Sequence, residues 1–307
     1  MSHGETLIAS AVALVLVAGP LLLGLAGFIS ARRAPPHTAS KAAGAWNWKL
    51  TVASALLYTL AFNLIFFIQE LFLVLPKALT PGLRPTLFHN NHRWEGDNSL
   101  ASLFQGTGAL AIFLTASACA LLLRRARGRS LTLRLFLIWV TYNGFLQSLP
   151  QVIVGAVEPG NDVGMAMDYL HLGAGAKTVA ALVALAAIPV AGLSLTGPLL
   201  SLAQRPAQLA GAAARSRFMF QVATVPALAA ILLIIPFRVP RNWVEVVMVP
   251  VVVTFVGIAW LQAGAWRASD AQPEGGAGAA AIAAPLGAAV ILLLLFQLLL
   301  RPGIHFY

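Results

Sequence analysis

Residues 50–75 read LTVASALLYTLAFNLIFFIQELFLVL, and Glu70 is the one charged residue in this stretch. A helix that is apolar on every face is either buried in a large protein or spans a membrane. About 20 apolar residues are enough to cross the roughly 30 Å hydrocarbon core of a bilayer. The stretch therefore predicts a membrane-spanning helix that carries one acid near its end.

The composition of the whole chain extends this prediction. Apolar residues make up 59% of the 307 positions and charged residues only 10%, against roughly 45–50% and about 25% in soluble domains. We expect an all-α, polytopic transmembrane bundle that forms a single integral membrane domain over residues 1–307. It would have about eight spans, near residues 7–30, 50–75, 100–123, 135–157, 169–195, 218–237, 243–266 and 279–300.

The basic residues alternate between the connecting segments, and this alternation predicts the orientation. Cytoplasmic loops carry an excess of Lys and Arg, so the inner side would be the one that holds thirteen of the twenty basic residues: Arg32, Arg33, Lys41, Lys49, Arg124, Arg125, Arg127, Arg129, Arg134, Arg205, Arg215, Arg217 and Arg267. Both termini then lie outside, and we expect a place in the bacterial cytoplasmic (inner) membrane. Topology explains the net charge of +10, so the expected partner is the lipid bilayer and not nucleic acid.

The outer segment 76–99 is long for a connection without structure, and such segments are often functional. His89 and His92 are three residues apart and would face the same way on a helical turn. One interpretation is a shared metal ion; the other is two histidines at headgroup level that bind nothing. The segment is also the expected contact for a membrane-protein partner.

A second outer segment, 158–171, adds further candidate metal ligands. Asp162, Asp168 and His171 would join the two histidines on one side of the bilayer. Such a set suits a divalent transition metal, zinc or copper. The alternative for Asp168 is the N-cap of the fifth span.

Polar residues inside the predicted spans suggest a path for an ion or small solute, since such groups usually face a bundle interior or a cavity. Asn63 and Glu70 share one helix face. The other members of this intramembrane polar path are Asn143, Gln147, Gln151 and Lys177. The alternative is structural: interhelical hydrogen bonds and a Glu70–Lys177 ion pair that hold the helices together.

Over about residues 50–195, the order of features resembles the site-2 proteases, the M50-type membrane zinc metallopeptidases. That family carries a His-Glu-x-x-His motif, then a Gly-containing motif, then an Asp-Gly motif whose Asp completes the zinc site. The corresponding segments here are Gln69-Glu70-Leu71-Phe72-Leu73, Gln105-Gly106-Thr107-Gly108-Ala109 and Asn161-Asp162-Val163-Gly164. The resemblance implies that Glu70 is a general base and Asp162 a metal ligand.

The chain departs from that family at decisive positions. Gln69 and Leu73 stand where the zinc-binding histidines would be, so the motif cannot bind zinc in the family's way. The family's catalytic centre lies toward the cytosol, whereas the basic residues place Glu70 at the outer end of its span. A degenerate relative would have recruited His89 and His92 instead.

Three classes of function follow from these residues. As an enzyme, the protein would be a membrane metallohydrolase with Glu70 as the catalytic base. As a transporter or channel, it would conduct an ion or solute along the polar path. As a non-catalytic subunit, it would bind another membrane protein through residues 76–99.

Overall fold

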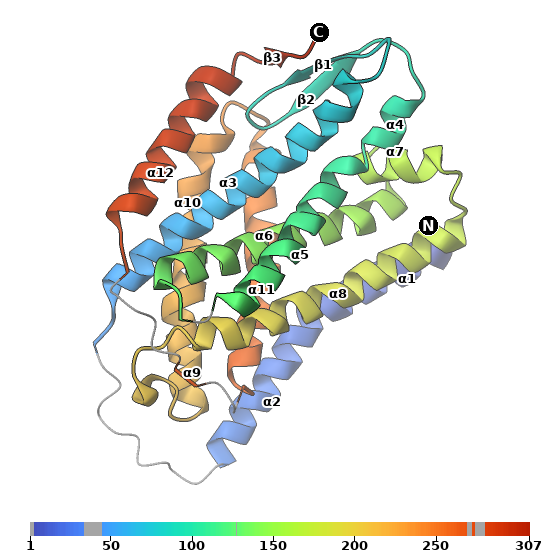
Figure 1. The fold of residues 1–307 in the computed structure, drawn as a ribbon. Helices are drawn as coiled ribbons and strands as arrows, with labels where there is room; N and C mark the ends of the chain where they lie inside the picture. Colours follow the sequence, from blue (N-terminus) through green and yellow to red (C-terminus); the bar gives the residue numbers. More distant parts are fainter. Residues whose placement is uncertain (1–2, 34–44, 127, 269–271, 274–279) are drawn as a thin grey trace.

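The computed structural model describes residues 3–33, 45–126, 128–268, 272–273 and 280–307. Lys41 and Arg127, two of the expected inner basic residues, lie outside this part of the chain. The structure is mainly helical, as Figure 1 shows. The helices are α1 (His3–Ala13), η1 (Leu14–Ala18), α2 (Gly19–Arg33), α3 (Trp48–Ala78), α4 (Leu100–Phe104), α5 (Thr107–Arg125), α6 (Leu131–Val157), α7 (Asp162–Tyr169), α8 (Ala174–Leu200), η2 (Pro206–Gln208), α9 (Ala212–Met219), η3 (Phe220–Thr224), α10 (Val225–Arg238), α11 (Trp243–Ala265), α12 (Ala283–Leu294) and η4 (Leu295–Leu300).

Seven helical segments of the described residues are long and apolar enough to cross a membrane. They confirm that the chain is an integral membrane protein of mainly helical structure. The predicted block 135–157 corresponds to α6, which has 27 residues but is not one of the seven. Helix α6 lies inside the bundle against α3, α5 and α8, where it needs less apolar surface because little of it faces lipid.

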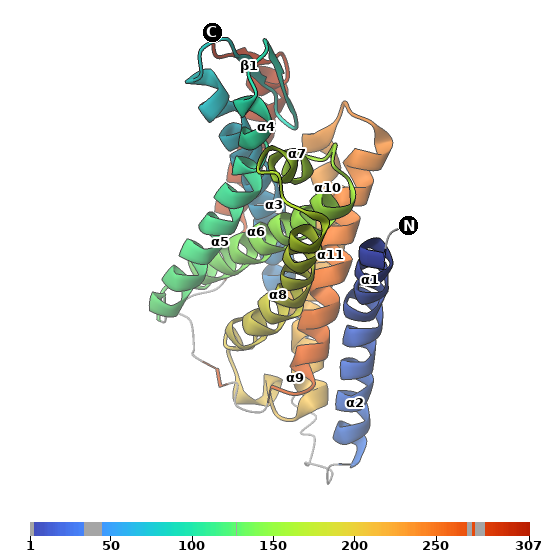
Figure 2. The same cartoon turned by 90° about the vertical axis from the view of Figure 1, so that its right-hand side faces the viewer.

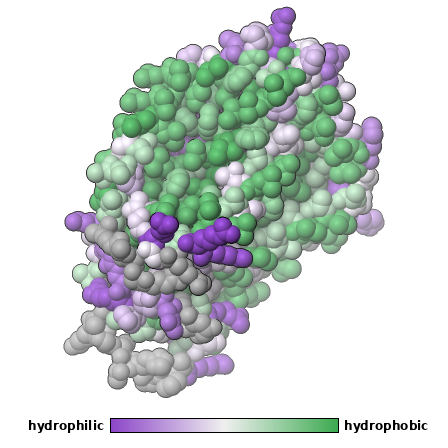
Figure 3. All heavy atoms as spheres, in the orientation of Figure 1, coloured by the Kyte–Doolittle hydropathy of each residue, from purple (hydrophilic) through white to green (hydrophobic). Residues whose placement is uncertain are grey.

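The two ends of the bundle differ in character. The β1–β2 hairpin, α4 and α7 lie at one end, and α9 and the end of α2 at the other (Figures 1 and 2). We call these the hairpin end and the α9 end. Figure 3 shows a broad hydrophobic surface between them, with hydrophilic residues toward both ends. This is the pattern expected of a bundle that lies across a bilayer.

The interior of the bundle centres on α3 and α6. In the most apolar window of α3, 78% of the residues are buried, against 11% for the first helix, His3–Arg33. Tyr58, Trp139 and Tyr142 are fully buried and pack edge to face, with Tyr58 and Trp139 ring centroids 4.9 Å apart. The Tyr58 hydroxyl lies 2.8 Å from the Thr254 hydroxyl of α11. This aromatic cluster packs α3, α6 and α11 against one another in the interior of the bundle.

The segment 76–99 folds as a β-hairpin, which the sequence did not predict. Strands β1 (Arg84–Leu87) and β2 (His92–Glu95) pair antiparallel, and β3 (Ile304–His305) joins the other edge of β1. The expected helical turn at His89 and His92 is therefore wrong. The Phe88 N–H donates to the Asn91 carbonyl over 2.8 Å and closes a turn. His89 lies within this turn, whereas His92 is the first residue of β2.

Two further expectations are corrected around α7. The expected fifth span, 169–195, begins later than predicted, since α8 starts at Ala174 and α7 is a separate short helix. Asp168 is not an N-cap. Asn161 caps α7 through its side-chain oxygen, and Gly173 precedes α8.

Close packing of α5 on α6 generates the first prediction. A Cβ atom at Gly144 would lie 2.6 Å from the Ala116 Cβ and 2.9 Å from the Ile112 carbonyl oxygen. Overpacking of this kind costs about 1–3 kcal/mol, so Gly144→Ala should lower the free energy of unfolding by that amount in SDS titrations of the protein in mixed micelles. Gly197→Ala in α8 is the control, because a Cβ there meets nothing within 4 Å. Equal effects of the two substitutions would contradict the packing.

Candidate functional site

A cavity of about 510 Å³ opens in the hairpin-end half of the bundle. It is bounded by α3, β2, α6, α7, α11 and the α10–α11 turn. Its ionisable wall residues are Glu70, His92, Asp162, Arg238, Arg241 and Glu245. These residues come from four separate stretches of the chain, at Glu70, His92, Asp162 and residues 238–245, so the fold gathers them.

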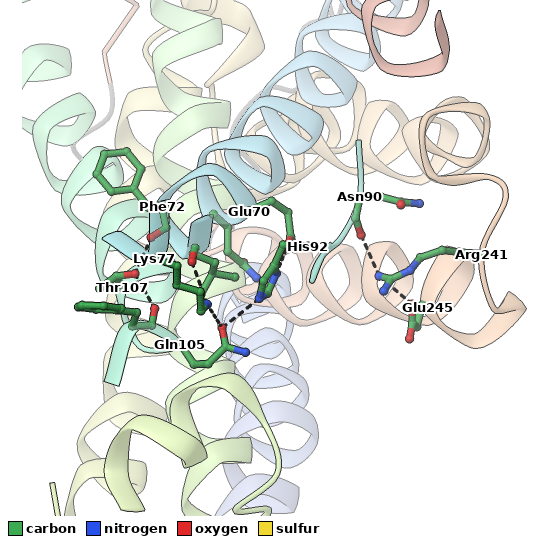
Figure 4. A network of polar contacts seen from close by, with 12 residues as sticks. Glu70, Phe72, Lys77, Asn90, His92, Gln105, Thr107, Arg241 and Glu245 are labelled. Atoms are coloured by element: carbon green, nitrogen blue, oxygen red, sulfur yellow. Dashed lines mark hydrogen bonds and ion pairs between the residues drawn. The ribbon is translucent and has the colours of Figure 1, made fainter. Parts of the chain in front are cut away.

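Glu70 and His92 form a buried pair on the cavity wall (Figure 4). The imidazole Nδ1 of His92 lies 2.8 Å from the Glu70 Oε2, and their side chains are 7% and 6% exposed. Glu70 comes from the part of α3 at the hairpin end, and His92 opens strand β2. An isolated buried carboxylate is very costly, and this contact supplies the missing partner.

The neighbours of His92 determine where its protons lie. The Gln105 Oε1 lies 3.0 Å from His92 Nε2 and also accepts a hydrogen bond of 2.9 Å from the Lys77 ammonium. An amide oxygen only accepts, so His92 Nε2 carries a hydrogen. The opposite orientation of the Gln105 amide is excluded, because it would place the NH₂ group, a donor, against the Lys77 ammonium, which is also a donor. One further proton is then shared between His92 Nδ1 and Glu70.

Trp94 and Lys77 complete this side of the site. Residues two apart on a strand face the same way, and the Trp94 ring stacks on His92 with an interplanar angle of 12°. The Lys77 ammonium lies 4.5 Å from the centroid of the Trp94 ring and donates to the Leu73 carbonyl over 2.9 Å. These contacts hold the imidazole in one orientation.

Asp162 faces the cavity from the first turn of α7. Burial raises the pKa of its carboxyl above the usual 3.8. The negative charge of Glu70 raises this pKa further, while the positive charges of His92, Lys77 and Arg241 oppose the rise. The carboxyl therefore interacts with the Glu70–His92 pair without a direct bond to it.

Two arginines at the α10–α11 turn form the opposite wall. The Arg241 Nη1 lies 2.8 Å from the Glu245 Oε2 and donates to the Asn90 carbonyl over 2.8 Å (Figure 4). Arg238 is 2% exposed, with its guanidinium carbon 4.2 Å from the centroid of Phe66. Its Nε donates to the Glu245 carbonyl, and its Nη1 has no hydrogen-bond partner among the described residues.

The structure does not bring the five predicted metal ligands together. His89 is buried in the hairpin turn, where its Nε2 donates to the Val239 carbonyl over 3.2 Å. Burial lowers the pKa of His89, and three nearby arginines lower it further. Asp168 pairs with Lys177, and His171 is exposed. Within the described ranges, no three His, Cys, Asp or Glu side chains gather as a metal-binding group.

The predicted polar path is divided in the same way. Gln147 and Gln151 face the cavity. Asn63 and Asn143 are almost fully buried and donate to carbonyls of their own helices. The alternative Glu70–Lys177 ion pair is wrong, because Glu70 pairs with His92 and Lys177 with Asp168.

The two positions that depart from the protease motif have packing roles. The Gln69 Oε1 accepts a hydrogen bond of 2.8 Å from Gln151, and Leu73 is fully buried. Of the two histidines that a degenerate relative would recruit, the structure places only His92 beside Glu70. In comparisons with known proteins, no family model, no curated protein and no solved structure matches this chain.

Sequence reasoning missed Gln105, Arg238, Arg241 and Glu245 as parts of the site. The arginines were counted only as outer-side basic residues. One signal was available for Arg238 and Glu245: both are charged residues at the ends of apolar blocks, at the same end of the bundle as Glu70. Gln105 had no such signal, because a lone glutamine after a short helix is common.

A double-mutant cycle tests the Glu70–His92 contact. Hydrogen bonds to charged groups contribute about 1.5–3 kcal/mol, so Glu70→Gln and His92→Gln should show a coupling energy in that range in SDS-unfolding measurements. The Arg241–Glu245 pair, with side chains 23% and 44% exposed, is the control and should couple by about 0–1 kcal/mol. A Glu70–His92 coupling within that lower range would contradict the buried pair.

The pH dependence of stability tests Asp162. Its pKa is higher in the folded than in the unfolded chain, so its contribution to the free energy of unfolding falls as pH rises above about 4. Asp162→Asn removes this loss, and the stability of the variant relative to wild type should therefore increase between about pH 4.5 and 7.5. Urea or thermal unfolding at both pH values measures it, with exposed Asp97→Asn as the control. A relative stability that stays flat or falls would refute the assignment.

Proposed function

We propose that this protein lies in the bacterial cytoplasmic (inner) membrane and binds a ligand in the cavity at its hairpin end. The Glu70–His92 pair exchanges a proton with that ligand or in step with its binding. The hairpin end faces outward, both termini lie outside, and α6 crosses the membrane as an eighth span. The proposal keeps the predicted outer-side site but replaces its metal with an acid–base pair.

One observation carries this proposal: a buried carboxylate–imidazole pair in hydrogen-bond contact lies on the wall of a ligand-sized cavity. Ligand sites are typically concave, largely apolar and supplied with a few converging polar groups. Ionisable groups inside a membrane domain usually mark a functional site.

The buried tyrosines in the interior of the bundle favour a binding site that opens to one side of the membrane over a channel that runs through it. One turn inward from Leu146 on the cavity wall lies Tyr142, whose hydroxyl donates to the Val253 carbonyl over 2.9 Å. Tyr58, two turns inward from Phe66, is held against Thr254. Both rings are fully buried and lie on α3 and α6 between the cavity and the α9 end.

Cysteine accessibility tests the site and its orientation. The chain has a single cysteine, Cys119, so a Cys119→Ser background is silent toward thiol reagents. In that background, Gln151→Cys should react in intact cells with a small membrane-impermeant methanethiosulfonate, because Gln151 faces the cavity. Asn143→Cys, which is fully buried two turns inward on the same helix, is the matched control and should stay unmodified.

Two exposed positions fix the orientation in the same assay. Asp97→Cys near the hairpin should react in intact cells, and Arg129→Cys near the start of α6 only after permeabilisation. The reverse pattern would overturn the orientation. Protection of Gln151→Cys while Asp97→Cys reacts would overturn the outward-open cavity.

A further inference from the structure

A second, almost wholly apolar groove of about 560 Å³ lies beside the cavity. Five residues line both spaces: Leu146, Pro150, Val154, Val252 and Val253. The polar chamber and the apolar groove therefore adjoin each other along α6 and α11. A ligand that fills both must be polar at one end and apolar at the other.

The far wall of the groove is formed by the first helix. Ile8, Val12 and Leu16 line it from that side. Only 11% of the residues in the most apolar window of this helix are buried within the chain, and Figure 2 shows α1 and α2 at the edge of the bundle beside α11. The groove thus lies at a loosely packed boundary between the bundle and the surrounding lipid.

The charges in the polar chamber select the kind of headgroup. Its direct ion pairs are Glu70–His92 and Arg241–Glu245. Arg238 has neither a carboxylate partner nor, at Nη1, any hydrogen-bond partner among the described residues, although it is 2% exposed. A buried charge without a partner is costly, and the planar guanidinium binds phosphate in a two-pronged geometry.

We propose that the ligand is a phosphate-bearing amphiphile from the outer leaflet, with its phosphate on Arg238 and one acyl chain in the apolar groove. The chain enters between the first helix and α11. Arg238 Nη1, which is covered in the protein without ligand, turns toward the cavity and donates to the phosphate oxygens, which completes the hydrogen bonding of this guanidinium. The inference rests on the proposed function, because it names the ligand class of the same cavity.

Three probes separate the parts of this ligand: dodecyl phosphate, inorganic phosphate and dodecanol. Calorimetry on the full chain in maltoside micelles should show binding of dodecyl phosphate, with at least tenfold weaker binding of either part alone. Arg238→Gln should weaken dodecyl phosphate binding at least tenfold, and Arg238→Lys should restore part of the loss because it keeps the charge. Arg93→Gln, an exposed arginine on β2, is the control and should bind normally.

A second variant tests the groove without touching the charge. Val252 lines both spaces and is 42% exposed, so Val252→Trp should fill the junction and fold normally. It should weaken dodecyl phosphate at least tenfold and leave inorganic phosphate unchanged. Unchanged dodecyl phosphate binding in this variant would overturn the placement of the chain.

Other outcomes also decide the proposal. Equal affinity for inorganic and dodecyl phosphate would make the ligand a free phosphate and overturn the lipid source, and equal affinity for dodecanol would overturn the role of Arg238. Dodecyl phosphate should also slow the modification of Gln151→Cys. If Gln151→Cys reacts from outside but none of the three probes binds, the lipid ligand is contradicted while the outward-open cavity is supported. If Gln151→Cys does not react from outside, the proposed function itself is contradicted.

Discussion

The constraint on which the site depends is the cost of one carboxylate in an apolar helix. Glu70 is 5% exposed on α3, toward the hairpin end, where an unpaired charge would be strongly destabilising. The chain supplies His92 from a different element, and Gln105 and Lys77 hold that imidazole in place. The contact between His92 and Glu70 therefore fixes the position of the hairpin relative to α3.

The hairpin is fixed by contacts that are distant in sequence. Strand β3, at the end of the described chain, pairs with β1 through Thr86 and Leu87. The hairpin turn is bound to the α10–α11 turn, since His89 donates to the Val239 carbonyl and Arg241 donates to the Asn90 carbonyl. The same contacts that place His92 therefore place Arg238 and Arg241 on the opposite wall.

The sequence predicted the features that depend on composition and length. Long apolar blocks identified the membrane helices, because the bilayer sets their minimum length, and the lone charge in residues 50–75 identified Glu70. It could not choose between His89 and His92. That choice depends on the hairpin fold of segment 76–99, in which His92 pairs with Leu87 whereas His89 lies in the turn. Nor could it place Lys177, whose partner Asp168 lies on α7, a short helix within a segment that the sequence predicts to be a connection between spans.

The location of the shared proton tests the account most directly. Nitrogen NMR of the protein labelled at histidine, with the His92 signals assigned by their loss in His92→Gln, reports the state of each ring nitrogen. The account predicts that Nε2 carries a hydrogen throughout, and that Nδ1 shows a strong hydrogen bond that is lost in Glu70→Gln. A neutral ring with its only hydrogen on Nδ1, or His92 signals that do not respond to Glu70→Gln, would contradict the proton-sharing pair.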